Sequence, residues 1–147
     1  MDTVKVAAGI ISPQYNDDPP FYPDTSHPEL PFAECSHHPN HPYNLLRDLL
    51  YRLGYDSEHY GTPQWNPLGT IIHPGQTVLL KPNFVLSFNS SGDDLFSVVT
   101  HPSILRALID YAYIALKGTG RIIIADTPQM DCNWDQLMAA LRLDSIQ

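Results

Sequence analysis

The chain has 147 residues, of which 43% are hydrophobic and 16% charged, proportions that fit one globular domain of ordinary size. Its formal net charge of -8 argues against a nucleic-acid or anionic-membrane partner, because phosphate binding needs clustered Lys and Arg. No apolar run approaches the roughly 18 residues of a membrane helix, and the start of the chain lacks the basic and apolar regions of a signal peptide. We therefore expect a cytoplasmic protein.

Proline dominates the first half of the chain. The sequence has 14 prolines, which cluster between Pro13 and Pro42. The apolar residues 4–11 are predicted to form a strand. Residues 12–43 are predicted to be an ordered, Pro-rich aromatic arm whose direction proline sets. Pro42 then occupies the tolerated first position of a predicted helix over 42–53, where leucines recur at helical spacing.

The second half predicts a β–α–β unit. Apolar runs at 77–81 and 121–126 are predicted strands, and Thr100 or His101 caps a predicted helix over 102–117. The crossover makes the two strands parallel. A polar insertion over 84–99 follows the first strand, with Asp93 and Asp94 at its tip, and a last helix is predicted over 133–142.

These elements define the predicted fold class: α/β, with a small, mostly parallel sheet and long Pro-rich irregular segments. Residues 1–147 are predicted to form a single domain. Open α/β sheets usually have more strands than this chain provides. We therefore expect the N-terminal part of a longer protein, or a sheet that is completed by association in a homo-oligomer.

Polar side chains follow both predicted strands where they end. The carboxyl ends of parallel strands meet at one edge of the sheet, where α/β proteins bind their ligands. The start of the following helix reaches the same edge if the 84–99 insertion folds as a lid. The sequence therefore predicts a small-molecule site formed by Lys81, Asn83, Thr100, Asp126 and Thr127, with His101 as a candidate catalytic residue.

Each of these residues has a structural alternative. Lys81 suits a phosphate or carboxylate, or it pairs with Asp126 and closes the strand ends. Asp126 suits Mg²⁺, or it caps the segment that follows. His101 has an ordinary pKa of about 6.5, which suits a general acid or base, or it caps the helix.

A second cluster lies in the arm. Cys35, His37, His38 and His41 are residue types that bind zinc or copper, and a solvated loop is the alternative. Cys35 and Cys132 are the only cysteines, and they form no Cys-x-x-Cys pair. An iron–sulfur cluster is therefore not expected, and two free thiols are the simpler expectation.

Several motifs in a fixed order resemble an uncharacterised family, domain of unknown function 362, and within it the branch encoded with bacterial surface-polysaccharide genes. The motifs are Trp65-Asn66-Pro67-Leu68-Gly69, His73-Pro74-Gly75, Leu80-Lys81-Pro82-Asn83-Phe84, Thr100-His101-Pro102 and Asp126-Thr127-Pro128. The resemblance implies a longer protein, because relatives are usually much longer. Some relatives carry a ferredoxin-like cysteine segment, which this chain lacks, and Ala125 stands where relatives often have glycine.

Three functions follow as hypotheses. The first is binding or conversion of a small anionic metabolite, a phosphorylated or nucleotide-linked sugar, in surface-polysaccharide biosynthesis; the pathway is implied by the resemblance alone. The second is a non-catalytic binding or assembly module, suggested by the arm and the small sheet. The third is a metal-dependent redox accessory protein.

Overall fold

The computed structural model of the chain describes residues 4–146, and it contains three α-helices and two strands. Helix α1 spans His41–Arg52, strand β1 Thr77–Leu80, helix α2 Pro102–Leu116, strand β2 Arg121–Ile124 and helix α3 Trp134–Leu141. Short 3-10 helices cover Ser57–His59 (η1), Leu95–Ser97 (η2) and Leu143–Ser145 (η3). The predicted small α/β fold is confirmed, and the predicted bounds of these three helices and two strands lie within two residues of the observed ones.

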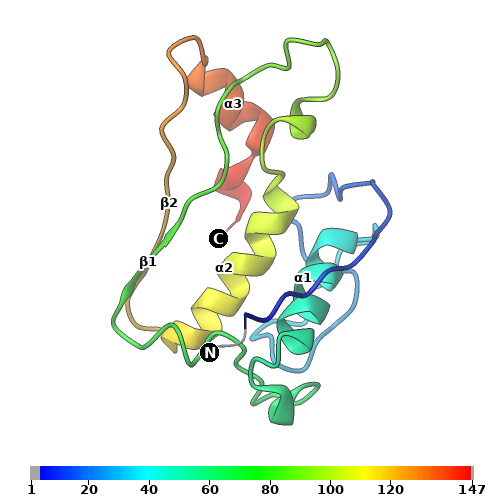
Figure 1. The fold of residues 1–147 in the computed structure, drawn as a ribbon, viewed down its shortest axis with the longest axis vertical. Helices are drawn as coiled ribbons and strands as arrows, with labels where there is room; N and C mark the ends of the chain where they lie inside the picture. The colour runs from blue at the N-terminus through cyan, green and yellow to red at the C-terminus, as the bar shows by residue number, and fades with distance from the viewer. Residues whose placement is uncertain (1–3, 147) are drawn as a thin grey trace.

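Helix α2 is the centre of the molecule. Figure 1 shows it between the sheet on one side and α1 with the arm on the other. Strands β1 and β2 are parallel, with Thr77 opposite Arg121 and Leu80 opposite Ile124, and α2 is their crossover. Exposure alternates along both strands, so one face of the sheet packs inward while the other leaves Leu79 61% exposed.

The predicted strand over residues 4–11 is wrong. This segment is extended but pairs with no other strand of residues 4–146, and Val4, Val6 and Ile10 are almost fully exposed. It runs beside α1, where Lys5 Nζ donates to the Leu53 carbonyl at 3.4 Å, and not along the sheet. Apolar, β-branched composition predicts a strand only where a partner strand is available.

Two hydrophobic clusters lie on opposite sides of α2. The first joins the arm, α1 and α2 through Leu30, Tyr43, Leu50, Trp65, Ala107 and Tyr111. The second joins the segment after β1, the start of α2, and α3 through Phe84, Val99, Leu105, Leu137 and Leu141. Among the described residues, no helix combines the length and the apolar character that crossing a membrane requires.

Buried polar side chains attach the arm to the helices. Glu29 of the arm accepts from Arg47 of α1 at 2.7 Å and from the Tyr111 hydroxyl of α2 at 3.1 Å. Asn40 caps α1 by accepting from the Tyr43 N–H, and it donates to the carbonyls of residues 21 and 22. The arm is therefore ordered through specific buried contacts, although it has no regular secondary structure.

Candidate functional site

Lys81 and Asp126 meet where the two strands end. Lys81 Nζ donates to Asp126 Oδ1 at 2.5 Å, and Asp126 Oδ2 accepts from the Phe84 N–H at 2.6 Å. The Lys81 hydrogen bond and the backbone N–H groups of Phe84 and Thr127 lower the pKa of Asp126 to about 2. The Lys81 side chain is 69% exposed, whereas that of Asp126 is 5% exposed. This pair closes the strand ends, and its two charges neutralise each other.

Asn83 and Thr100 form a second pair at the same edge. The Asn83 N–H donates to Thr100 Oγ1 at 2.9 Å, and the Thr100 N–H donates back to the Asn83 carbonyl at 3.0 Å. The Asn83 side-chain amide also donates to the Val98 carbonyl at 2.8 Å. These bonds join the two ends of the 84–99 insertion. The structure thus brings four of the predicted ligand residues to one edge as two hydrogen-bonded pairs, Lys81 with Asp126 and Asn83 with Thr100. Thr127 lies exposed beside them.

His101 makes its contacts with the arm. It is the N-cap of α2, where Nδ1 accepts from the Ser103 N–H at 3.1 Å, and the residue is 1% exposed. Its ring stacks on Tyr15 of the arm, with centroids 4.3 Å apart and planes 6° apart. The ring of Phe96, from η2, meets it edge-on at 4.3 Å. His101 is therefore the floor of an aromatic cluster between the arm and the 84–99 insertion.

The buried His101 ring is neutral near pH 7. Burial lowers the pKa of His101 to about 4, although the carboxylates of Asp17 and Asp94 act in the opposite direction. Because Nδ1 accepts from the Ser103 N–H, the proton of the neutral ring lies on Nε2. Nε2 is 3.7 Å from Asp17 Oδ1, which is too long for a hydrogen bond. Within residues 4–146, this N–H has no hydrogen-bond acceptor.

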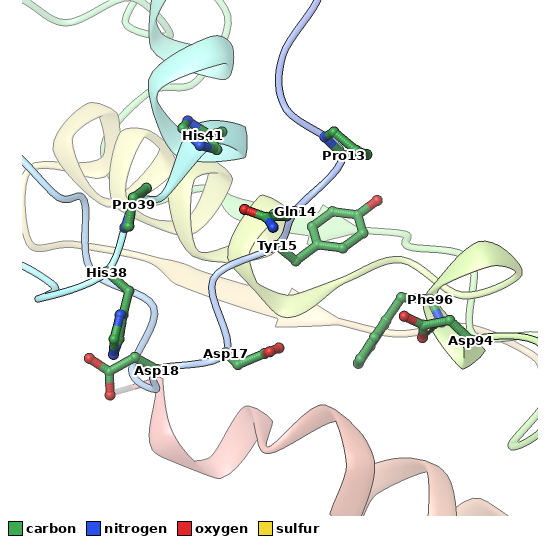
Figure 2. Close-up of a pocket in the computed structure, with 10 residues that line it drawn as sticks. All are labelled: Pro13, Gln14, Tyr15, Asp17, Asp18, His38, Pro39, His41, Asp94 and Phe96. Carbon is green, nitrogen blue, oxygen red and sulfur yellow. Dashed lines mark hydrogen bonds between the residues drawn. The ribbon is translucent and has the colours of Figure 1, made fainter.

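A groove of about 650 Å³ opens beside this cluster. Three separate segments line it: the arm near residue 15, the start of α1, and η2 (Figure 2). The lining residues are Pro13, Gln14, Tyr15, Asp17, Asp18, His38, Pro39, His41, Asp94 and Phe96. The groove therefore combines aromatic rings, carboxylates and imidazoles on one surface.

Asn16 holds this side of the groove in place. Its buried amide donates to Ser36 Oγ at 2.8 Å and to the His38 carbonyl at 3.2 Å, and its Oδ1 accepts from the Asp18 N–H at 2.7 Å. One side chain therefore connects the 15–18 turn to the 36–38 turn. These bonds hold together the two segments that carry Asp17 and His38.

The predicted metal ligands are only partly brought together. His38 and His41 line the groove, whereas Cys35 and His37 do not, and both cysteines are free thiols. In the described part of the chain, no three His, Cys, Asp or Glu side chains lie close enough to share a metal ion. A Mg²⁺ ion at Asp126, which remains a prediction, would have to displace the Lys81 ammonium.

Sequence reasoning missed most of the groove. Tyr15, Asp17, Asp18 and Phe96 were not predicted as site residues, and Asp94 was predicted to be only a polar loop tip. The available signal was the run of an aromatic residue and two acids directly before a Pro-Pro pair in the arm. That signal alone does not show which other segments it will face.

Comparison of the chain with protein-family models, with curated proteins and with solved structures finds no match. The resemblance to domain of unknown function 362 therefore stays a prediction from motifs.

Proposed function

We propose that this chain binds a small hydroxyl-rich ligand of the sugar class in the groove beside His101. The observation that carries the proposal is the groove itself, which places the aromatic rings of Tyr15 and Phe96 beside the Asp17 carboxylate, 3.7 Å from Nε2 of His101. A ligand hydroxyl accepts from the Nε2–H of His101 and donates to Asp17 at the same time.

The other groove residues suit the same ligand class. Tyr15 and Phe96 offer aromatic surface to the C–H face of a sugar ring, while Gln14 and Asp18 offer hydrogen-bonding groups to its hydroxyls. The volume of about 650 Å³ lies within the range of roughly 300–1,000 Å³ for small-molecule sites. A groove with these properties supports binding of one or two sugar rings.

The wider proposal is a role in bacterial surface-polysaccharide biosynthesis, in which the chain binds or converts a sugar. The pathway rests on the motif resemblance alone. The lowered pKa and the burial of His101 favour a role as a fixed hydrogen-bond donor over a role as a general base near neutral pH. Any proton transfer would then fall to the carboxylates of the groove.

A phosphorylated or nucleotide-linked sugar at the strand ends is the second candidate. It is favoured by the exposed ammonium of Lys81, which stands beside the exposed Thr127. A ligand phosphate there has to compete with Asp126 for Lys81. Lys81→Ala would weaken binding of a sugar phosphate and leave a neutral sugar unaffected, whereas Lys117→Ala, at the exposed end of α2, would change neither.

A thermal-shift screen of neutral sugars, sugar phosphates and nucleotide sugars tests the groove proposal, because a ligand that binds only the folded state raises the melting temperature. Tyr15→Leu removes one aromatic face of the groove and is expected to weaken the affinity for a neutral sugar about tenfold. Tyr51→Leu is the matched control, because Tyr51 is 40% exposed and Tyr15 38% exposed, and Tyr51 lies outside the groove.

Equal affinities of the Tyr15→Leu and Tyr51→Leu proteins for the same sugar would contradict binding in the groove. The absence of any stabilisation by neutral sugars at millimolar concentration would contradict the sugar class itself.

A further inference from the structure

We infer that the groove selects ligands with a protonated amine, such as an amino sugar, over neutral and anionic sugars. The inference rests on the proposed function and adds the charge of the ligand to it. Three carboxylates line the groove, those of Asp17, Asp18 and Asp94, and among the lining residues that the structure describes none is a lysine or an arginine. A bound cation would therefore meet a one-sided negative field.

Arg142 contacts the backbone of Asp17, but among the described residues it forms no ion pair with these carboxylates. Arg142 Nη2 donates to the backbone carbonyl of Asp17 at 2.8 Å, and its guanidinium carbon lies 5.7 Å from the centroid of the Phe21 ring. The Asp17 side chain is 85% exposed and accepts no hydrogen bond from residues 4–146. The negative charge of Asp17 is thus available to a ligand.

Asp17 and Asp94 face the same space from two segments that are far apart in the sequence. Both carboxylates lie close enough to His101 to raise its pKa against the effect of burial. Figure 2 shows the Asp17 carboxylate pointing toward Asp94 and Phe96. Asp94 Oδ1 accepts from the Phe96 N–H at 2.9 Å, and no described residue donates to the other oxygen of Asp94. Each carboxylate can therefore accept from a ligand ammonium.

The aromatic rings favour an ammonium over a metal ion. Tyr15 and Phe96 both line the groove together with Asp17, and their ring centroids are 6.3 Å apart, so aromatic surface is available to a ligand cation. A divalent metal ion takes about six oxygen ligands, and no three potential ligand side chains among the described residues lie close enough to share one. The Nε2–H of His101 then donates to a hydroxyl of the same ligand, and an amino sugar provides such a hydroxyl.

The test is calorimetric titration of the full chain at pH 6 and low salt with glucosamine, glucose, N-acetylglucosamine, glucose 6-phosphate and n-butylamine. At this pH an amine with a pKa near 8 is protonated. We expect glucosamine to bind about tenfold more tightly than glucose or N-acetylglucosamine, and glucose 6-phosphate to bind most weakly. The preference for glucosamine should shrink in about 0.5 M salt, which screens charges.

Asp17→Asn and Asp94→Asn remove one charge each and keep the shape of the side chain. Both are expected to reduce the preference for glucosamine over glucose, and the double variant, which keeps only Asp18, to reduce it further. Asp93→Asn is the matched control, because Asp93 is an exposed acid next in sequence to Asp94 that does not line the groove. Asparagine also caps helices, so the Asp94→Asn protein keeps the start of η2.

The probes separate the two proposals. Equal affinities for glucose and glucosamine would overturn the charge inference and leave the sugar proposal intact. Binding of n-butylamine as tight as that of glucosamine would overturn the sugar proposal and keep the charge inference. Binding of none of the probes, or a glucosamine preference that is undiminished in the double variant, would overturn the inference.

Discussion

A buried ion pair between Glu29 and Arg47 contributes to the attachment of the arm to α1, and Arg47→Met tests its contribution. Glu29 Oε1 and Oε2 accept from Arg47 Nε at 2.7 Å and Nη2 at 3.2 Å, and the Glu29 side chain is fully buried. The Arg47 guanidinium also donates to the Tyr60 hydroxyl at 2.6 Å and lies 5.0 Å from the Trp65 ring centroid. Methionine fills much of the same volume but leaves the Glu29 carboxylate buried without a cation.

The expected loss is large. Removing one partner of a buried ion pair costs about 3–5 kcal/mol, because the remaining charge stays uncompensated. That loss is a substantial part of the roughly 5–15 kcal/mol by which a domain of this kind is stable. Urea unfolding followed by circular dichroism measures it as a lower midpoint with an unchanged slope.

Two further variants complete the measurement. Arg47→Met with Glu29→Leu removes both charges and is expected to recover much of the loss, because two apolar side chains can replace a buried pair. Arg52→Met is the matched control on the same helix. Arg52 pairs with Asp48 at 2.6 Å on the surface, where a pair contributes under about 1 kcal/mol.

The reasoning is refuted if Arg47→Met destabilises the protein no more than Arg52→Met. It is also refuted if the double variant is less stable than Arg47→Met alone. Either result would mean that the arm is held by its apolar contacts and not by the ion pair.

Three other predictions concern the arm, the cap of α2 and the turn before β2. The free energy of unfolding should fall as the pH drops from about 6.5 to 4, because His101 takes up a proton near pH 6.5 in the unfolded chain while burial lowers its pKa in the folded protein to about 4. His101→Asn, which keeps a cap on α2, should reduce the difference in stability between pH 7 and pH 5 measured by urea titration. An unchanged difference would count against this role of His101. Asn40→Ala should lower the free energy of unfolding in urea by about 2–4 kcal/mol, because it removes the cap of α1 and leaves the carbonyls of residues 21 and 22 without their donor. A loss under about 1 kcal/mol, the value for one exposed hydrogen bond, would contradict this prediction. Gly120→Ala should lower the melting temperature more than Gly118→Ala. Both residues have positive φ, but only at Gly120 would a Cβ lie 2.3 Å from a backbone oxygen, that of Gln76. Equal shifts in melting temperature would argue against that contact.

The helices and strands were predictable because their signals are local. Apolar runs end at Pro82 and Asp126, and the caps stand directly before the helices at His101 and Asn133. Caps and chain-breaking residues act on the backbone within one or two turns of their own position, so these elements can be predicted without knowing which distant segments they contact. The parallel pairing of β1 and β2 also followed, since a single crossover helix joins them.

The failures share one cause. Residues 4–11 have the composition of a strand, but a strand exists only where another strand pairs with it, and this segment lies beside α1. The pairing of Lys81 with Asp126 was one of two alternatives that the predicted sheet left open for Lys81, and the sequence could not decide between them. Contacts between segments distant in sequence depend on packing, which local patterns do not contain.

The α/β class, the β–α–β unit and the edge at which Lys81, Asn83, Thr100 and Asp126 meet could be predicted from local sequence patterns. That His101 turns toward the arm, and that a groove opens between Tyr15, Asp17 and Phe96, could be seen only in the packed molecule. The physical reason is the arm, which has no regular secondary structure and takes its course from buried contacts such as those of Asn16 and Glu29. Those contacts exist only once α1 and α2 have packed together.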